Sequence, residues 1–330
     1  MPTMYKVPPE DVGDRLDHWL SRQCPDLSRS HIQRLIQSGH VLLNGARHKN
    51  RHLVAAGDRV SLDIPPPPDS EPQPEAISLD ILFEDEQVLV INKPPGLVVH
   101  PAVGHPGGTL VNALLHHGAG QGRQDTLLRQ GIVHRLDKDT SGALVVAKTE
   151  QALASLQRQF KERTVQKRYR ALVRGRVLPE SGAIETLIGR HPRNRKKMSV
   201  QVENGRSALT HYTTVQQFAE ATLLDVMIET GRTHQIRVHM VHVGHPVLGD
   251  RQYGRTHSLS DGTPIDRQML HAAQLTFCHP VTGTTQSFSA PLPGDMETLI
   301  QRLHEIQPAT AATQPSRGFT SAWQTGKVDS

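Results

Sequence analysis

The segment HRLDKDTSG, residues 134–142, places several reactive side chains between two apolar stretches of the chain. We expect these stretches to be strands, and loops held by rigid strands commonly carry reactive groups. Asp137 and Asp139 lie two residues apart, so in a turn one carboxylate can cap backbone N–H groups while the other faces a cleft. An ionised carboxylate in a cleft can act as a nucleophile. The spacing leaves open which aspartate reacts. It also leaves open a purely structural turn, in which Thr140 and Ser141 bond the backbone.

The chain is basic, with a formal net charge of +5 and a pI near 9.4, which favours a polyanionic partner. Thirteen Lys or Arg residues, but only three Glu residues, lie between Arg158 and Lys197. In the densest part, residues 190–198, we expect four side chains to bind RNA phosphates: Arg193, Arg195, Lys196 and Lys197. A solvated basic loop would have the same composition. No apolar run reaches the length of a membrane span, so nucleic acid is favoured over a membrane.

Residues 1–64 have the pattern of a small α+β unit. A first helix has its apolar face at residues 16, 19 and 20, and Asp11 or Asp14 is expected to cap it. Ser28 is expected to cap a second helix, which Gly39 ends. Strands are expected at 41–43, before an Asn-Gly turn, and at 60–64. The second helix carries three side chains on its outward face, where they could bind a polyanionic partner: Arg29, His31 and Arg34.

Composition divides the rest of the chain. Residues 65–75, PPPPDSEPQPE, are expected to form a semi-rigid extended linker. Residues 76–306 alternate short apolar stretches with a few amphipathic ones, which predicts a mixed sheet with helices packed on it. Because they show no regular βαβ alternation, no GxGxxG and no GxxxxGK[ST], a Rossmann fold and a P-loop ATPase are excluded. Residues 307–330 have no apolar period and are expected to be a disordered tail.

The stretch 230–244 predicts a helix, with Thr233 as its N-cap and Gly244 as its end. Its apolar face is expected at residues 236, 240 and 243, so Arg237 lies one turn in and off that face. Four histidines, at 234, 239, 242 and 245, suggest a metal. However, HExxH is absent and no acidic or cysteine ligand lies nearby, so we predict none. The two cysteines, Cys24 and Cys278, form no CxxC pair, which fits a reducing cytoplasm.

Several segments resemble known families. DRLDHWLSR, SRSHIQRLIQSGHVLLNG and AGDRVSL together resemble the S4 RNA-binding module. HRLDKDTSG resembles the catalytic motif of the RluA family of pseudouridine synthases. NKPPGLVVHP, QKRYRALVRG, ETGRTHQIRVHMVHVGHPVLGD and LHAAQLTFCHP join it in family order. The matches cover about residues 77–305. With the S4 module, HPAVGHPGGTLVNALLHH resembles the RluD branch, which acts on large-subunit ribosomal RNA.

The resemblance implies a largely antiparallel mixed sheet and assigns roles to particular residues. Asp137 becomes the nucleophile and Arg237 its ion-pair partner. Arg135, grouped with His134, would enter the RNA stack and hold the target nucleotide out. Tyr169 would pack on the flipped uracil and could serve as a base. The substrate would be 23S ribosomal RNA, at the helix 69 stem-loop or another site, or else tRNA. We further expect a cytoplasmic monomer.

Pseudouridine is uridine with its glycosidic bond moved from N1 to C5 of the base. The base detaches, turns and reattaches, so no cofactor is expected. The carboxylate could attack the sugar carbon, add to C6, or remove a sugar proton to give a glycal, and the residue types are compatible with each of these routes.

A non-catalytic S4-type RNA-binding or ribosome-assembly protein would share the basic segments. A two-carboxylate glycoside hydrolase would suit Asp137 and Asp139 but would not explain the RNA-binding parts. An RNA methyltransferase would need a glycine-rich cofactor loop, which we do not find.

Overall fold

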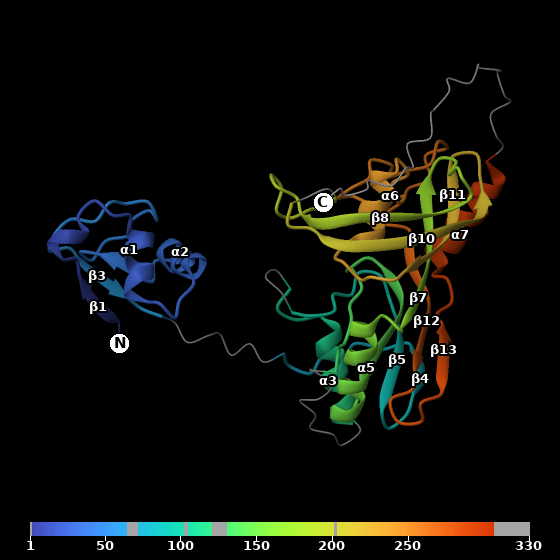
Figure 1. The fold of residues 1–330 in the computed structure, drawn as a ribbon, viewed down its shortest axis with the longest axis horizontal. Helices are drawn as coiled ribbons and strands as arrows, with labels where there is room; N and C mark the ends of the chain where they lie inside the picture. The colour runs from blue at the N-terminus through green and yellow to red at the C-terminus, as the bar shows by residue number, and fades with distance from the viewer. Residues whose placement is uncertain (1, 65–71, 102–104, 121–130, 201–202, 307–330) are drawn as a thin grey trace, which may run out of the picture. The chain divides into compact units, whose positions relative to one another are not determined.

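A computed structural model describes residues 2–64, 72–101, 105–120, 131–200 and 203–306 (Figure 1). The chain divides into two compact units, Met1–Glu71 and Pro72–Ser330, and each is described by itself. The division falls in the predicted linker 65–75, of which residues 65–71 lie outside the described residues, as does the predicted tail 307–330. In the described part of the chain, no helix is long and apolar enough to cross a membrane.

The first unit is a three-stranded antiparallel sheet with two α-helices. Its elements are β1 (Thr3–Lys6), η1 (Pro9–Asp11), α1 (Leu16–Gln23), α2 (Arg29–Ser38), β2 (Val41–Leu43) and β3 (Arg59–Leu62). The strand order is β1-β3-β2, and the sequence patterns did not reveal β1. Trp19 is 1% exposed and packs between the helices and the sheet with the other buried apolar side chains.

The predicted ends of α2 are confirmed. The Ser28 hydroxyl accepts from the His31 N–H at 3.3 Å, and Gly39 adopts φ 84°, the left-handed conformation that ends a helix. The predicted turn after β2 is also present, with Asn44 at φ 51° and Gly45 at φ 78°. Positive φ at both central residues is the geometry of a two-residue hairpin turn.

The predicted cap of α1 is wrong. Arg15 occupies the N-cap position and makes no side-chain cap hydrogen bond. Asp11 instead accepts hydrogen bonds from Trp19 Nε1, at 2.8 Å, and from Arg22, while Asp14 pairs with Arg22. The two carboxylates therefore bind side chains of α1 instead of its free N–H groups.

The second unit is a ten-stranded mixed sheet. Nine strands follow the order β4-β5-β6-β12-β7-β11-β10-β8-β9, and β13 pairs with β12. Their bounds are β4 (Ile81–Glu84), β5 (Val88–Lys93), β6 (Ser141–Ala147), β7 (Gln166–Arg174), β8 (Ser181–Arg190), β9 (Met198–Val200), β10 (Arg206–Gln217), β11 (Ala221–Ile228), β12 (Leu270–Cys278) and β13 (Thr285–Ser289). All neighbouring pairs are antiparallel except β6 and β12, which confirms the predicted fold class.

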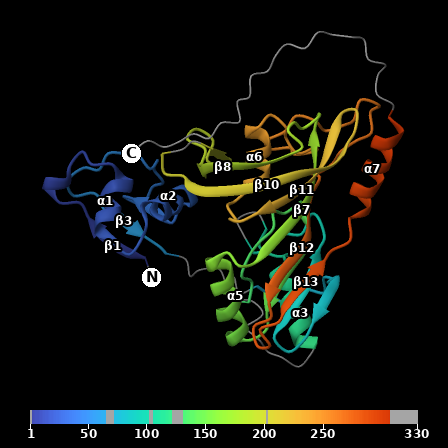
Figure 2. The same ribbon diagram turned by 45° about the vertical axis from the view of Figure 1, so that its right-hand side comes forward.

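The described residues of this unit also form the helices α3 (Leu110–Gly120), α5 (Glu150–Glu162), α6 (Gln235–His242) and α7 (Gly294–Glu305). In Figures 1 and 2, α3 and α5 lie toward the end of the sheet that holds β4 and β5, and α6 and α7 toward the end that holds β10. The α5 helix is amphipathic, and its Ala152 and Leu156 pack with Val88 and Val145 of the sheet. On α7, Met296 is fully buried in a separate cluster.

Two predicted elements are shorter than expected. The helix predicted over 230–244 begins only at Gln235, and its N-cap is His234 in the left-handed conformation, not Thr233. Its residues from Gln235 to Met240 are all buried, so the helix is enclosed by protein instead of showing a polar face to solvent. The apolar stretch before the catalytic-motif loop forms only an isolated bridge between Ile132 and Val146.

Candidate active site

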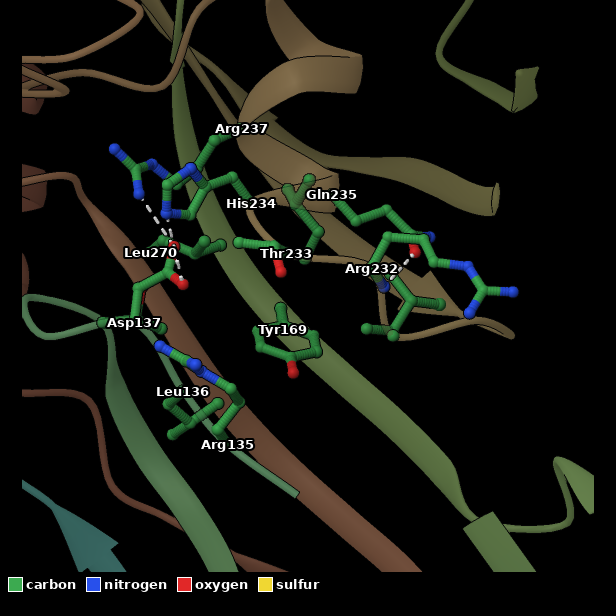
Figure 3. A pocket seen from close by; sticks show the side chains of 14 residues that line it. Arg135, Leu136, Asp137, Tyr169, Arg232, Thr233, His234, Gln235, Arg237 and Leu270 are labelled. Atoms are coloured by element: carbon green, nitrogen blue, oxygen red, sulfur yellow. Dashed lines mark hydrogen bonds and ion pairs between the residues drawn. The ribbon is translucent and has the colours of Figure 1, made fainter. Parts of the chain in front are cut away.

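A cavity of about 100 Å³ opens where several segments of the second unit meet. The 134–142 loop contributes Arg135, Leu136, Asp137 and Thr140, and β7 contributes Tyr169. The end of β11, the segment 231–234, the start of α6 and the start of β12 contribute the rest. Figure 3 shows the Asp137 carboxylate pointing toward Arg237 and His234. Of the two aspartates that the spacing left open, Asp137 lines the cavity and Asp139 does not.

Asp137 forms an ion pair with Arg237 on α6. Arg237 Nη1 donates to Asp137 Oδ2 at 2.8 Å, and the two side chains are 7% and 19% exposed, the arginine being the more buried. The geometry therefore brings together the two residues that the sequence motifs paired. Burial lowers the pKa of Arg237, but its hydrogen bonds with Asp250 and the charge of Asp137 raise it overall. A guanidinium that stays charged favours the ionised carboxylate beside it.

Asp250 holds the other edge of the same guanidinium. Arg237 Nε and Nη2 donate to its two carboxylate oxygens at 2.7 and 2.9 Å, and Asp250 also accepts from the backbone N–H groups of Gln252 and Tyr253. Burial raises the pKa of Asp250, but these hydrogen bonds and the charge of Arg237 lower it overall. The bidentate contact fixes the orientation of Arg237 and leaves Nη1 for Asp137. Sequence reasoning missed Asp250, although this residue ends the motif segment GHPVLGD.

Tyr169 presents a buried aromatic ring to the cavity from the middle of β7. The residue is 8% exposed and faces the cavity beside Asp137 (Figure 3). Burial and the nearby Asp137 charge both raise the pKa of its phenol. The phenol therefore stays protonated at neutral pH, which favours a packing role over a basic one.

The structure separates Arg135 from His134. Arg135 is exposed and lines the cavity, whereas His134 does not line it. His134 Nε2 accepts from the Val145 N–H at 3.0 Å, and its ring stacks on Phe160 at 4.7 Å. Burial lowers the pKa of His134 to about 3, so the ring is neutral. In these contacts His134 anchors the loop to β6 and α5.

The loop that carries Asp137 is also held by a buried lysine. Lys93 Nζ donates to the carbonyl oxygens of Pro94, Leu97 and Lys138 at 2.8, 2.9 and 2.9 Å. Burial lowers the pKa of Lys93 to about 7. Sequence reasoning gave Lys93 no role, although it lies next to the motif residues Pro94 and Pro95, because its three acceptors are backbone atoms.

Within the part of the chain that the structure describes, the hydroxyls of Thr140 and Ser141 bond side chains instead of the backbone. The Thr140 hydroxyl accepts from Gln268 Nε2 at 3.3 Å, and the Ser141 hydroxyl lies 2.9 Å from His271 Nδ1. Both contacts join the loop to the segment that leads into β12 or to β12 itself. The polar residues of the loop therefore fix its position against the sheet.

The predicted RNA-binding residues of α2 differ in their exposure and in their contacts with other side chains. Arg34 is exposed, His31 is half-buried, and Arg29 donates to Asp17 at 3.1 Å. Burial raises the pKa of Asp17, but hydrogen bonds from Gln33, Arg15 and Arg29 lower it to about 2 overall. Arg29 therefore also stabilises a buried charge of the first unit.

In the second unit, the predicted basic residues lie between β8 and β9. Arg193, Arg195 and Lys196 are exposed, and Lys197 Nζ lies 5.7 Å from the centre of the Tyr253 ring. Among the residues that the structure describes, no group of three His, Cys, Asp or Glu side chains could hold a metal ion.

Known proteins are similar to this chain in both sequence and structure. The RNA pseudouridylate synthase model matches residues 87–242, and the S4 domain model matches residues 14–60. An uncharacterized RNA pseudouridine synthase of Synechocystis is 46% identical over 300 residues, which cover 90% of this chain and 91% of that protein. Ribosomal large subunit pseudouridine synthase D of Xylella fastidiosa is 44% identical over 308 residues, which cover 91% of this chain and 92% of that protein. The solved structure of human RNA pseudouridylate synthase domain containing 1 is 28% identical, with a TM-score of 0.52, and covers 70% of this chain and 97% of that chain.

With relatives of this identity along 90% of its length, the chain is an RNA-modifying enzyme of the isomerase class. It belongs to the family of RNA pseudouridine synthases and carries an S4 domain ahead of the catalytic domain.

Proposed function

We propose that this enzyme isomerises uridines of 23S ribosomal RNA in the cytoplasm, as a monomer, with Asp137 as the nucleophile and the helix 69 stem-loop as its main target. The names of several relatives at 43–44% identity, ribosomal large subunit pseudouridine synthase D, support the choice of substrate. The observation that carries the catalytic assignment is the ion pair between Asp137 and the buried Arg237, at the wall of a cavity.

The target base must leave its stack before Asp137 can reach it, at a cost of a few kcal/mol. Arg135 is exposed at the cavity, and a guanidinium can stack on bases and bind phosphate. We propose that the Arg135 side chain fills the space that the base leaves. Tyr169 offers its face to the uracil within the cavity, beside the Asp137 carboxylate.

The test is the isosteric substitution Asp137→Asn, with Asp139→Asn as the matched control. A strain that lacks the enzyme is complemented with wild type or with either variant, and its ribosomal RNA is mapped by carbodiimide treatment and primer extension. We expect Asp137→Asn to give no pseudouridine and Asp139→Asn to give the wild-type map, because Asp139 does not line the cavity.

Full modification by Asp137→Asn would refute the nucleophile assignment. The wild-type map tests the substrate separately: signals in helix 69 support it, whereas signals confined to other 23S sites or to tRNA would replace it. Binding of the same RNA by Asp137→Asn, measured by filter retention, should be nearly normal, since the substitution removes a charge and keeps the shape.

A further inference from the structure

His234 lies between the proposed nucleophile and a tyrosine outside the cavity wall. Its Nε2 is 3.8 Å from Asp137 Oδ1, the carboxylate oxygen that Arg237 does not bind (Figure 3). Its Nδ1 is 2.8 Å from the Tyr253 hydroxyl, and the two rings meet edge to face at 5.5 Å. The imidazole therefore has one nitrogen toward Asp137 and the other toward a fixed partner.

The hydrogen bonds of Tyr253 favour one of the two neutral tautomers of His234. The Tyr253 hydroxyl accepts from the Met198 N–H at 2.7 Å, so its own hydrogen is free to donate to His234 Nδ1. Burial raises the pKa of Tyr253, which keeps that hydrogen in place at neutral pH. An imidazole that accepts at Nδ1 carries its proton on Nε2. The N–H then faces Asp137 Oδ1.

The backbone of His234 is also unusual. It has φ 56° at the N-cap of α6, and a non-glycine residue in this left-handed conformation carries strain that the surrounding structure must hold. Tyr253 supplies part of that support, and the Arg237 guanidinium lies 5.1 Å from the centre of the same ring.

We propose that His234 is a positioning residue for the reaction: held as its Nε2–H tautomer by Tyr253, it orients the free oxygen of Asp137 while Arg237 holds the other. This proposal rests on Asp137 being the nucleophile. We call the chain of contacts from the Met198 N–H through Tyr253 and His234 to Asp137 the relay. Met198 starts β9, directly after the predicted phosphate-binding residues in the basic hairpin that β8 and β9 form. The relay therefore runs from this basic hairpin toward the reactive carboxylate.

The pKa of His234 is lowered, mainly by burial, which favours the neutral imidazole. Among the surrounding charges, Asp137 and Asp250 raise this pKa, whereas Arg237 and Arg135 lower it. As the pH falls, protonation at Nδ1 would remove the acceptor of the Tyr253 hydrogen. The relay therefore operates above the pKa of His234.

The first test is spectroscopic and does not depend on activity. The full chain has 20 histidines, so a ¹⁵N-histidine long-range correlation spectrum of wild type is compared with that of His234→Gln to assign the His234 signals. We expect shifts typical of the Nε2–H tautomer in wild type. In Tyr253→Phe, which loses the hydroxyl and keeps the ring, we expect a mixture of tautomers. An Nδ1–H tautomer in wild type would overturn the relay.

The second test measures the rate of tritium release from 5-tritiated uridine in a 23S RNA fragment, in single turnover at saturating RNA. Tyr253→Phe and His234→Ala should each be slower by at least about tenfold, with the RNA dissociation constant within about twofold. His234→Gln should recover part of the loss, since the amide still offers an N–H. Melting curves by circular dichroism show whether each variant is folded.

The outcomes separate the relay from the proposed function. Wild-type rates in folded Tyr253→Phe and His234→Ala would overturn the relay and leave the nucleophile assignment intact. A wild-type enzyme that releases no tritium from this RNA would count against the proposed substrate, and the tautomer of His234 would then decide the relay alone.

Discussion

At the scale of single residues, Arg237 links two carboxylates with different environments. Asp250 is almost fully buried and binds the guanidinium at two points, whereas Asp137 binds one nitrogen and stays 19% exposed toward the cavity. The more buried carboxylate orients the arginine, and the arginine in turn stabilises the ionised form of the more accessible one. This division leaves Asp137 paired with a buried cation and reachable from the cavity.

Tyr169 permits a prediction that separates its two possible roles. Tyr169→Phe keeps the aromatic face and removes a phenol whose pKa is raised by burial and by Asp137, so it should keep the single-turnover rate within about tenfold. Tyr169→Ala removes the face and should lose about a hundredfold, because the uracil is no longer held in place. The tritium-release assay measures both. A Tyr169→Phe enzyme as slow as Tyr169→Ala would show that the phenol takes part in proton transfer.

At the scale of elements, the loop before β6 is positioned by the parallel junction of β6 and β12. Gly142 pairs with Ala272 there and has φ 118°. A Cβ at this position would lie 2.2 Å from the Ala272 carbonyl oxygen and 2.6 Å from its nitrogen, so any other residue would push the two strands apart. The close approach sets where the 134–142 loop ends.

Gly142→Ala should therefore destabilise the catalytic domain. We expect a loss of about 2 kcal/mol or more in the free energy of unfolding, from overpacking against backbone and from the positive φ. Gly283→Ala is the matched control, because Gly283 also has positive φ, at 68°, but a Cβ there would meet nothing within 4 Å. It should lose only about 1 kcal/mol. Urea unfolding followed by circular dichroism measures both; equal midpoints for the two variants would contradict the steric argument.

At the scale of the whole molecule, the residues that we predict to bind RNA occur in both units. The first unit has the S4 domain with Arg34 exposed on α2, and the second has the basic hairpin between β8 and β9 beside the relay to Asp137. Each unit has a buried apolar core of its own.

Removal of residues 1–64 should weaken RNA binding and leave the chemistry intact. For every phosphate that the shortened chain no longer neutralises, the slope of log K against log salt should become less negative by about 0.7–0.9. The single-turnover rate at saturating RNA should stay at the wild-type value. Filter binding over a range of salt concentrations gives the slope. Unchanged affinity at every salt concentration would show that the S4 domain contributes no binding.

The sequence by itself determined the fold class, the ends of α2, the hairpin turn at Asn44–Gly45 and the segment that holds the reactive aspartate. These depend on local chemistry: caps, glycines at positive φ, apolar periods and a motif that is contiguous in the chain. The start of α6 was misplaced because its N-cap is held by a tyrosine that lies 19 residues further along the chain.

The motif resemblance had already pointed to Asp137, but only the tertiary structure shows which groups surround and support it. Asp137 meets an arginine 100 residues away, and that arginine is oriented by Asp250 and flanked by Tyr253. Lys93 holds the loop through backbone carbonyls, which leave no trace in residue type. The physical reason is that the charge state of a buried carboxylate depends on the groups around it in space, and folding brings those groups together from distant parts of the chain.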